Sequence, residues 1–358
     1  MTQRKVVVLG GGILGVSTAV HLVRAGAQVV LVTQSELADG ASGRSLSWLN
    51  SAGVRSTSYH VLRMLGIDRY RTLFAADPHR EWLRFDGGVW WTTPDRSDVT
   101  RARHEHEVAK GYDSHLVSRP PAGQLAIHNP GEGWVSLPHL IEELAAELIR
   151  RGGEVVTGAG RCSVLVENGR ARGVHGAAGT EWRGDSVVVA CGAATPAVVS
   201  ELGVTIPDAS PLSMLVVTDS VEADLSTVLN TPRAAIRPNP GSTYAVDHSW
   251  YEEHIVEHDD GSYSIDERYV KELLAEASAL FADDVELQPA SWKLGRKPIP
   301  GDGRPVFGEL DTVPGCHVAF THSGATLGLI AGELTAYEIL TGTRHPLLAD
   351  FRPSRFQS

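Results

Sequence analysis

The sequence predicts a fold that is α/β in one part and α+β in another. Residues 5–32 have the pattern of a strand, a helix and a second strand, the unit from which parallel sheets are built. Residues 205–290 instead contain short segments of alternating apolar and polar side chains, which indicate an antiparallel sheet. The chain has 358 residues, more than a single hydrophobic core usually holds, so we expect two closely packed domains.

The N-terminal unit is defined by apolar runs with glycines between them. Residues 5–9 (KVVVL) form a continuous apolar run, as expected for a parallel strand that is buried on both faces. A helix over residues 16–25 carries one apolar stripe, and Gly26 is placed to end it. Residues 29–32 form the second buried strand, and the connection between the strands is expected to be right-handed.

The remaining elements follow from the same patterns and from turn residues such as Asn168-Gly169. After a helix that follows Asn50, they are a strand at 87–93, a helix at 138–151, a strand at 154–156, a hairpin of 162–166 with 172–175, a strand at 186–190, strands at 212–218 and 243–246, a helix at 266–281, a strand at 317–320 and a helix at 328–340.

The composition disfavours several kinds of protein and partner. The net charge of −11 repels phosphate backbones, so we expect no nucleic-acid partner. The three cysteines are odd in number and widely spaced, which argues against a disulfide framework and for a reducing compartment. We find no zinc-ligand spacing, no signal peptide and no apolar run long enough to span a bilayer. We therefore expect a cytoplasmic protein without a metal site.

A glycine motif joins the first strand to the first helix. Gly10-x-Gly12-x-x-Gly15 stands between a strand and a helix, the context in which this pattern indicates dinucleotide binding. Gly10 allows the tight turn, Gly12 lets backbone N–H groups approach a pyrophosphate, and Gly15 lets the helix pack against the strand. The helix N-terminus adds about half a positive charge. We expect pyrophosphate contacts from Gly10, Gly12, Ile13, Leu14 and Gly15.

The usual fourth element of this motif is an acid that holds the ribose hydroxyls. Here its position is Thr33, which can make a hydrogen bond but offers no carboxylate. We expect Thr33 and Gln34 to lie at the ribose, with Glu36 as an alternative partner.

A tract of small residues after the second strand indicates which dinucleotide binds. Residues 39–45 (DGASGRS) are too rich in Gly and Ser to form a core element. In flavoproteins the chain runs here beside the ribityl chain and the isoalloxazine ring, and this approach needs small residues. We therefore expect FAD, with contacts from Ser42, Gly43, Arg44 and Ser45.

Together with three further blocks, these residues resemble the D-amino-acid oxidase superfamily of flavoproteins, in particular its glycine oxidase and monomeric sarcosine oxidase branch. The blocks that carry the resemblance are VVVLGGGILGVSTAVHLVRAGAQVVLV (6–32), GASGRSLSWLN (40–50), DSVVVACGAATP (185–196), and the C-terminal pair RKPIPGDGRPVFG (296–308) and HSGATLGLIAGELTAYEILTG (322–342).

The resemblance implies that both domains are discontinuous. A Rossmann-like FAD-binding domain would consist of residues 1–55, 135–205 and 292–358. A substrate domain would be inserted as residues 56–134 and 206–291, with an antiparallel sheet that roofs the flavin.

The resemblance also assigns cofactor contacts at two further strand ends. Cys191 and Gly192 would contact FAD after the strand at 186–190. A loop before the last long helix would lie along the flavin ring, where its backbone N–H groups could stabilise negative charge on reduced flavin. This loop consists of Ser323, Gly324, Ala325, Thr326 and Leu327. The alternative is an ordinary helix that Ser323 caps.

The C-terminal block departs from the family at two positions. Relatives of the glycine oxidase type carry an Arg before the Pro of this block, and it holds the substrate carboxylate. Here that residue is Lys297, preceded by Arg296, and a Lys pairs with a carboxylate only as a point charge. A carboxylate contact and a solvated turn residue are both open for Lys297. Relatives of the sarcosine oxidase type attach FAD through a Cys whose position is Gly295 here, so we expect FAD to be bound without a covalent link.

The resemblance implies an FAD-dependent oxidoreductase that acts on an amine or an amino acid. A hydride would leave the carbon next to nitrogen, which gives an imine and reduced flavin, and oxygen or another acceptor would reoxidise the flavin. His322, beside the flavin loop, and His248, in the roof sheet, are candidate catalytic residues. The alternatives are a 2-hydroxy acid or a cyclic imine as the substrate, and a non-catalytic flavin-binding redox subunit.

Overall fold

The computed structural model describes residues 3–119, 124–282 and 284–357. The chain divides into two compact units. The first contains the described parts of Met1–Gly43, Leu137–Pro211 and Arg296–Ser358, and the second contains those of Arg44–Ser136 and Leu212–Gly295.

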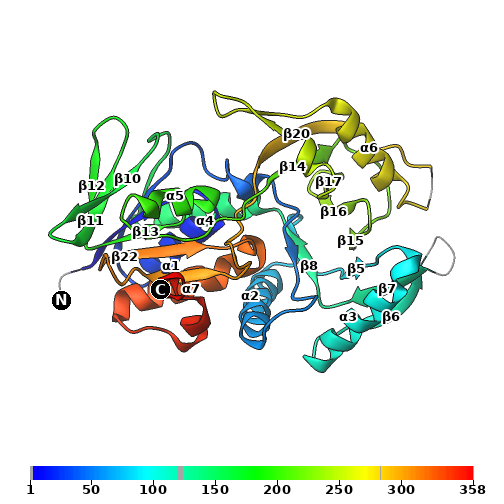
Figure 1. Ribbon diagram of the computed structural model, residues 1–358, viewed down its shortest axis with the longest axis horizontal. Helices are drawn as coiled ribbons and strands as arrows, with labels where there is room; N and C mark the ends of the chain where they lie inside the picture. The colour runs from blue at the N-terminus through cyan, green and yellow to red at the C-terminus, as the bar shows by residue number, and fades with distance from the viewer. Residues whose placement is uncertain (1–2, 120–123, 283, 358) are drawn as a thin grey trace. The chain divides into compact units, whose positions relative to one another are not determined.

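A six-stranded sheet forms the centre of the first unit, in the order β21-β22-β13-β1-β2-β9 (Figure 1). Neighbouring strands are parallel, except that β21 is antiparallel to β22. The carboxyl ends of the parallel strands therefore lie at one edge of the sheet. The strands are β1 (Lys5–Leu9), β2 (Gln28–Val32), β9 (Glu154–Val156), β13 (Ser186–Val189), β21 (Val306–Glu309) and β22 (Cys316–Phe320).

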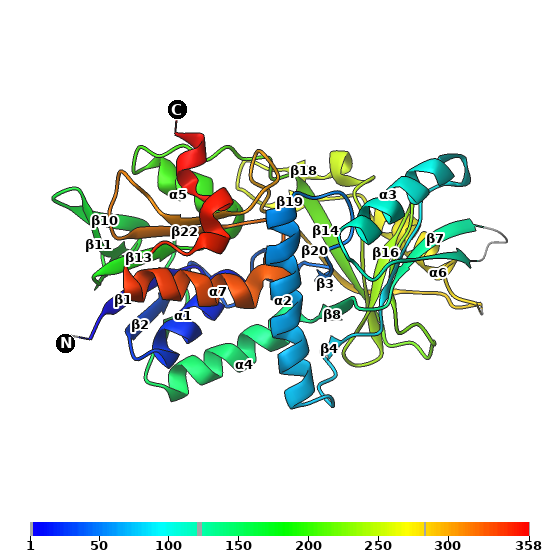
Figure 2. The same ribbon diagram turned by 90° about the horizontal axis from the view of Figure 1, so that it is seen from below.

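The two faces of this sheet are covered differently. On one face α1 packs against α4 and α7, and Figure 2 shows the three helices side by side. On the other face, Val7 and Leu9 of β1 pack with Val174 of the small sheet β10-β11-β12. The elements are α1 (Ile13–Arg24), α4 (Leu137–Arg150), α5 (Thr195–Ser200), α7 (Gly324–Thr341), β10 (Ser163–Glu167), β11 (Arg170–His175) and β12 (Glu181–Arg183).

The second unit is built on an eight-stranded sheet in the order β20-β14-β17-β16-β15-β5-β7-β6. Its neighbours are mainly antiparallel, and β15 and β5 form a parallel pair. Helix α6 lies over one face, where its Leu273 packs with Ile236 and Val246 (Figure 1). The elements are β5 (Gly88–Trp90), β6 (His115–Arg119), β7 (Gln124–Asn129), β14 (Leu212–Thr218), β15 (Val228–Asn230), β16 (Ala235–Asn239), β17 (Thr243–Asp247), α6 (Glu267–Ser278) and β20 (Pro289–Arg296).

Residues 44–55 form part of the second unit, and the domain bounds expected from the sequence stay a prediction. Strand β3 within this segment pairs with β8, and the Arg63 guanidinium donates a 2.8 Å hydrogen bond to the Asn50 carbonyl. The remaining elements of this unit are β3 (Trp48–Leu49), α2 (Thr57–Ala76), β4 (Leu83–Arg84), α3 (Ser97–Ala109), β8 (Gly133–Val135), β18 (Val256–Glu257) and β19 (Tyr263–Ser264).

The predicted fold class is confirmed: the parallel Rossmann-like sheet and the antiparallel sheet are both present. Strands 5–9, 154–156 and 212–218 have the predicted bounds, whereas the last long helix begins at Gly324 rather than at 328. Helix α3 and strands β6, β7 and β20 were not expected. No helix in the described part of the chain is long and apolar enough to cross a membrane.

Candidate functional site

Four parallel strands of the first unit end beside one another, and residues expected to bind the cofactor follow each of them. Gly10 follows β1, Thr33 follows β2, and Cys191 and Ser323 come shortly after β13 and β22. Ligands of open parallel sheets bind at the carboxyl ends of the strands. The topology thus collects residues from four distant parts of the sequence at the edge where a dinucleotide would bind.

The glycine turn after β1 is fixed by close contacts between backbone atoms. Gly10 has a φ of +122° and donates a 2.8 Å hydrogen bond to the carbonyl of Val32. A Cβ on Gly10 would overlap the carbonyl oxygen of Ala190, and a Cβ on Gly15 would overlap that of Gly10. Larger residues are therefore excluded at both positions.

Helix α1 begins at this turn, at Ile13. Its N-cap residue, Gly12, provides no side chain to cap the helix, and the first turn contains no acid. The Ile13 N–H donates a 3.1 Å hydrogen bond to Ser42 Oγ, while the Leu14 side chain is buried. The start of α1 therefore offers backbone N–H groups and a positive dipole end, which suit a phosphate.

Thr33 lies directly beneath the glycine turn. A Cβ on Gly11 would come within 2.9 Å of Thr33 Oγ1, so the hydroxyl faces the turn. The Thr33 N–H donates a 2.9 Å hydrogen bond to Val156, which fixes the backbone at this point. The side chains of Gln34 and Glu36 are exposed. Thr33 is the better placed of these residues for a ribose contact.

Helix α7 begins next to α1. Ser323 occupies its N-cap position, and the Ser323 N–H donates a 3.1 Å hydrogen bond to Thr321 Oγ1. A Cβ on Gly324 would lie 3.7 Å from Ile13 Cγ2, so the first turns of the two helices are adjacent. Residues Ala325, Thr326 and Leu327 belong to the first turn of α7 and not to a loop before it. Two positive helix ends therefore converge at the sheet edge.

Cys191 and Gly192 stand where the chain leaves β13. The thiol of Cys191 is directed at the Leu9 carbonyl, with 3.6 Å between Sγ and the oxygen, and burial raises its pKa to about 12. Gly192, with a φ of +56°, begins a short 3₁₀ turn over Gly192–Ala194. The protonated thiol is a packing group here and not a nucleophile.

Arg44 and Ser45 belong to the second unit. The Arg44 guanidinium lies against Gly295, and a Cβ on that glycine would overlap it. Ser45 Oγ accepts a 3.0 Å hydrogen bond from the Ser47 N–H. The position at which relatives attach FAD through a Cys is thus covered by an arginine.

Arg296 is the last residue of β20 and Lys297 follows it, and both residues belong to the first unit. The Lys297 N–H donates a 2.9 Å hydrogen bond to the Pro211 carbonyl, and the Arg296 guanidinium donates a 3.3 Å hydrogen bond to that of Ser210. Both side chains are half-buried. Their contact with a substrate carboxylate stays a prediction.

The two candidate histidines lie in different units. His322 is exposed at the start of α7. The ring of His248 bridges two backbone groups: Nδ1 accepts from the Trp250 N–H at 3.4 Å, which leaves Nε2 to donate to the Thr231 carbonyl at 3.2 Å. This arrangement gives His248 a role in holding the turn after β17. Its catalytic role stays a prediction, without support from this geometry.

The second unit contains a buried acid that the sequence analysis missed. Glu132 is 0% exposed, and Tyr112 donates a 2.7 Å hydrogen bond to its Oε1. Burial, with the neighbouring charge of Glu107, raises the pKa of Glu132 to about 8 against the opposing hydrogen bond from Tyr112. A Cβ on Gly88 would overlap Oε2, so the acid fits only because residue 88 is glycine. The sequence gives no signal for Glu132 beyond its place in a turn between two strands.

Glu107 is the second buried acid of this unit, and its environment differs. Arg103 Nε lies 2.9 Å from it, and the Gly53 N–H, Ser114 Oγ and Asn129 Nδ2 donate hydrogen bonds of 2.7, 2.9 and 3.1 Å. Burial acts to raise the pKa of Glu107, but Arg103 and the hydrogen bonds outweigh it and lower the pKa.

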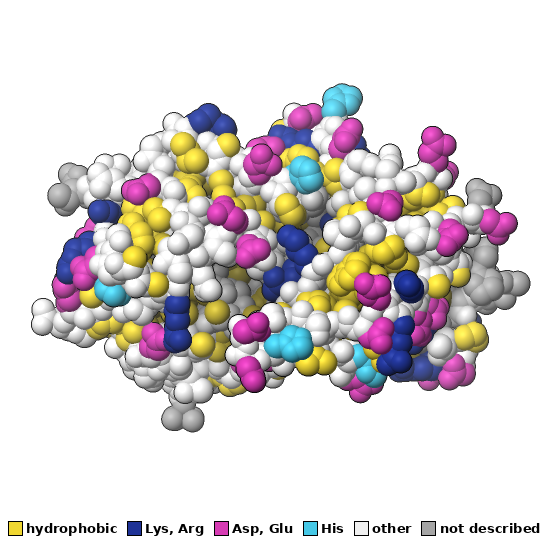
Figure 3. Space-filling view, turned by 90° about the horizontal axis from the view of Figure 1, so that it is seen from above, with side chains coloured by type: hydrophobic (Ala, Val, Ile, Leu, Met, Phe, Trp, Pro, Cys, Tyr) yellow, Lys and Arg dark blue, Asp and Glu magenta, His cyan; other side chains and the backbone are white. Residues whose placement is uncertain are grey.

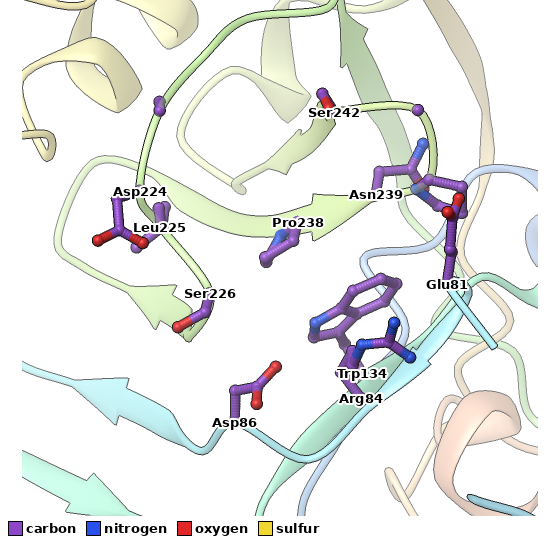
Figure 4. Close-up of a pocket in the computed structure, with 13 residues that line it drawn as sticks. Glu81, Arg84, Asp86, Trp134, Asp224, Leu225, Ser226, Pro238, Asn239 and Ser242 are labelled. Carbon is purple, nitrogen blue, oxygen red and sulfur yellow. The ribbon is translucent and has the colours of Figure 1, made fainter. Parts of the chain in front are cut away.

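A pocket of about 450 Å³ lies within the second unit. Figure 4 shows Arg84 beside the Trp134 ring, with Asp86 and Asp224 at some distance from Glu81. Three of its lining side chains are acids against one arginine, so the pocket does not suit a carboxylate or a phosphate.

Figure 3 shows acidic and basic side chains interspersed on the face that it presents. Within residues 3–119, 124–282 and 284–357, no group of three His, Cys, Asp or Glu side chains could hold a metal ion.

Comparison with known proteins identifies relatives along the whole chain. The family described as DAO, FAD dependent oxidoreductase, matches residues 5–338. The uncharacterised oxidoreductase YurR of Bacillus subtilis is 23% identical over 367 residues, which cover 94% of this chain and 95% of that protein. The glycine oxidase of Pseudomonas putida is 28% identical over 226 residues, 57% of this chain and 60% of that protein.

Solved structures share the fold. Glycine oxidase from Bacillus cereus has a TM-score of 0.80 at 19% identity, over 98% of each chain. An L-amino acid deaminase from Proteus vulgaris has a TM-score of 0.83 at 21% identity, over 99% of this chain and 94% of that one. Iminodiacetate oxidase from Chelativorans sp. has a TM-score of 0.81 at 20% identity, over 97% of this chain and 98% of that one.

Proposed function

Since the chain belongs to the DAO family of FAD-dependent oxidoreductases, we propose that it oxidises the carbon next to nitrogen in an amino acid or a secondary amine. The products would be an imine and reduced flavin, and oxygen is the proposed final acceptor. The observation that supports this most directly is the convergence of the starts of α1 and α7 at the edge where β1, β2, β13 and β22 end.

The residues at this edge fit FAD. Close contacts leave no room for a side chain at Gly10 or Gly15, and the start of α1 presents backbone N–H groups that can donate hydrogen bonds to a pyrophosphate. Thr33 would hold the ribose in place of an acid. The first turn of α7 would place its N–H groups along the flavin ring. FAD supplies the hydride acceptor of the reaction when it is bound.

The side chains of the protein must bind the substrate. They must hold the substrate's carboxylate, accept the amine in its neutral form and exclude water, because the hydride leaves most easily from an uncharged amine. Lys297 and Arg296 are the proposed cationic groups on the first unit. His322 is the proposed proton acceptor, and its exposure would let a proton pass to solvent.

The names of the structural relatives support the choice of substrate class. They include glycine oxidase, L-amino acid deaminase, iminodiacetate oxidase and L-proline dehydrogenase, which are all named for compounds with nitrogen next to the oxidised carbon. At identities of 16–21% this likeness shows the fold, and the substrate class is our proposal.

An anaerobic titration of the yellow protein tests the proposal. Oxidised flavin absorbs at about 450 nm. This absorbance should disappear when one member of a panel of amino acids and N-methyl amino acids is added. Readmission of air should restore it if oxygen is the acceptor. Bleaching by 2-hydroxy acids and by none of the amines would contradict the proposal. Denaturation should release all the flavin into solution, because Gly295 offers no thiol for a covalent link.

A further inference from the structure

Two acids line the pocket of the second unit without a pairing partner in the described part of the chain. They are Asp86 and Asp224, whose carboxylates make neither a hydrogen bond nor an ion pair with any described residue. Burial raises the pKa of Asp86, although the charge of Arg84 acts to lower it. The volume of about 450 Å³ lies in the range of small-molecule sites, roughly 300–1,000 Å³.

Arg84 does not form an ion pair with either acid. It is the one cationic residue among the described lining residues, and its Nη1 donates to the backbone carbonyls of Leu83 at 2.9 Å and Pro78 at 3.4 Å. With Glu81 as the third acid, the lining carries three carboxylates and one guanidinium, a net charge of −2. The pocket therefore favours a cation and disfavours an anion.

An N–H group without an acceptor faces the same pocket. Trp134 lies in β8, lines the pocket and is 3% exposed. Its indole Nε1 is buried and has no hydrogen-bond partner in the described part of the chain. Figure 4 shows this nitrogen on the side of the ring that faces Asp86 and Ser226. A buried donor without an acceptor is unfavourable, so this position calls for an acceptor from outside the chain.

The direction of the Trp134 N–H group is set by what holds the ring. Cζ of Arg237, a residue of β16 that is 3% exposed, lies 5.1 Å from the centre of the ring. The Arg237 guanidinium is itself oriented by hydrogen bonds of 2.7 Å to the Pro238 carbonyl and 3.0 Å to Asn239 Oδ1. Arg237 packs against the ring and is not among the described residues that line the pocket.

These groups together define the chemistry of a ligand. The acids call for a cation with N–H groups, and Trp134 calls for an acceptor atom. A metal ion is not supported, because no group of three His, Cys, Asp or Glu side chains in the described ranges could hold one. A carboxylate would provide the acceptor but would be repelled by three acids. An organic ammonium ion that also carries a neutral oxygen meets both requirements.

We propose that this pocket is a second binding site, which takes an organic ammonium ion with a hydroxyl or amide oxygen. Asp86 and Asp224 accept hydrogen bonds from the ammonium group, and the Trp134 N–H donates to the oxygen. None of the residues expected to contact FAD is among the described lining residues. The site therefore goes beyond the proposed function, and its occupancy does not depend on flavin reduction.

Anaerobic calorimetry of the FAD-loaded protein with three small probes tests this site. Ethanolamine carries both groups, propylamine keeps the ammonium group without the oxygen, and ethylene glycol keeps the oxygens without the charge. We expect ethanolamine to bind, propylamine to bind roughly threefold more weakly, and ethylene glycol roughly tenfold more weakly. Added salt should weaken the binding of ethanolamine, because it screens the charge of the acids.

Two substitutions separate the parts of the site. Asp86→Asn, at an exposed position, should weaken ethanolamine and propylamine alike, by roughly fivefold, because it removes one charge. Trp134→Phe should weaken ethanolamine by roughly threefold and leave propylamine unchanged, because it removes the N–H donor. Asp259→Asn is the matched control. This exposed acid lies in the turn between β18 and β19 and does not line the pocket, so all three affinities should stay as in the parent.

The outcomes separate this inference from the proposed function. Undetectable ethanolamine binding, or equal affinity of ethanolamine for the parent and Asp86→Asn, would overturn the site. The flavin absorbance is followed in the same titrations, and an amine that bleaches it should do so equally in the parent and Asp86→Asn. Loss of bleaching in the variant would overturn a site separate from the flavin. If no amine bleaches the flavin but ethanolamine binding still depends on Asp86, the proposed function fails and the pocket site stands.

Discussion

The two units of this protein place their polar groups in different ways. At the sheet edge of the first unit the available groups belong to the backbone and to small side chains, such as the N–H groups after Gly12 and the hydroxyls of Thr33 and Ser42. In the second unit they are ionisable side chains buried within the fold, above all Glu132 and Arg237. The first arrangement suits a cofactor of fixed shape, whereas the second makes the properties of the unit depend on the charges of its side chains.

The difference determines what each unit tolerates. A backbone site depends on the absence of side chains at a few positions, so that adding a single methyl group destroys it. A side-chain site depends on charge and burial, so that its properties respond to pH and to isosteric replacement. Four changes sharpen or break this contrast, in order of decreasing expected effect.

Gly15→Ala should have the largest effect on function, because it disrupts the turn on which cofactor binding depends. The added methyl group would overlap the carbonyl oxygen of Gly10, and backbone atoms on both sides cannot move away. We expect a loss of about 3 kcal/mol or more in the free energy of unfolding and little bound flavin. Denaturant unfolding and the ratio of flavin to protein absorbance measure the two effects. Gly40→Ala is the control, because a Cβ there meets nothing within 4 Å; equal flavin content in both variants would contradict the backbone site.

Glu132→Gln should change the pH dependence of stability in the second unit. The pKa of Glu132 is about 8 in the folded protein, above its value of 4.5 for an exposed acid. The folded state therefore holds the proton more tightly, and its stability falls as the pH rises from about 4.5 to about 8. Gln is neutral throughout, so the variant should gain stability relative to the parent over this range, by up to about 1.4 kcal/mol per unit of pKa shift. Urea unfolding at about pH 5, about pH 6.5 and about pH 8 measures this pH dependence of stability.

The acid next to it provides the control with the opposite sign. The pKa of Glu107 is lowered, so its contribution to stability is present at neutral pH and is lost as the pH falls. Glu107→Gln should therefore be least stable, relative to the parent, at neutral pH and approach it in acid. The same trend in both variants would show that Arg103 and the hydrogen bonds to Glu107 do not distinguish the two acids.

Gly295→Ala tests the contribution of Arg44 to flavin binding. The methyl group would displace the Arg44 guanidinium, which is the flexible end of a side chain, so the fold should change little. We expect the dissociation constant for FAD to rise by roughly threefold to tenfold, about 1 kcal/mol. In an Arg44→Met background the same change should have no effect on the affinity. Equal losses of FAD affinity in both backgrounds would show that Arg44 does not contribute to flavin binding.

Ser42→Ala should have the smallest effect. It removes the acceptor of the Ile13 N–H at the start of α1, which is worth about 1 kcal/mol in the protein without flavin. Bound pyrophosphate can replace this acceptor, so the loss in melting temperature should shrink when FAD is added. Exposed Ser35→Ala is the control, and an undiminished loss in the loaded protein would contradict the position of the pyrophosphate.

The sequence predicted the first unit better than the second for a physical reason. Glycines at positions 10, 12 and 15 are required by local geometry, so the turn and the strands beside it could be recognised from a short stretch. The residues around Glu132 and Arg237 are ordinary in their local context, and their properties arise only when distant strands bury them. The start of α7 was placed four residues late because Gly324 was assigned to a loop, whereas it begins the helix next to Ile13.

The ionisation state of the cysteines in the first unit affects how well such an enzyme would resist oxidation in air. An oxidase that uses oxygen releases hydrogen peroxide, and peroxide attacks thiolates rather than thiols. Burial raises the pKa of Cys191 and of Cys316 to about 12 and also raises that of Cys162. At neutral pH almost no thiolate is therefore present at Cys191, which follows β13 at the cofactor edge, or at Cys316, which begins β22. If the proposed reaction with oxygen takes place, burial of these thiols protects them from the peroxide that it releases.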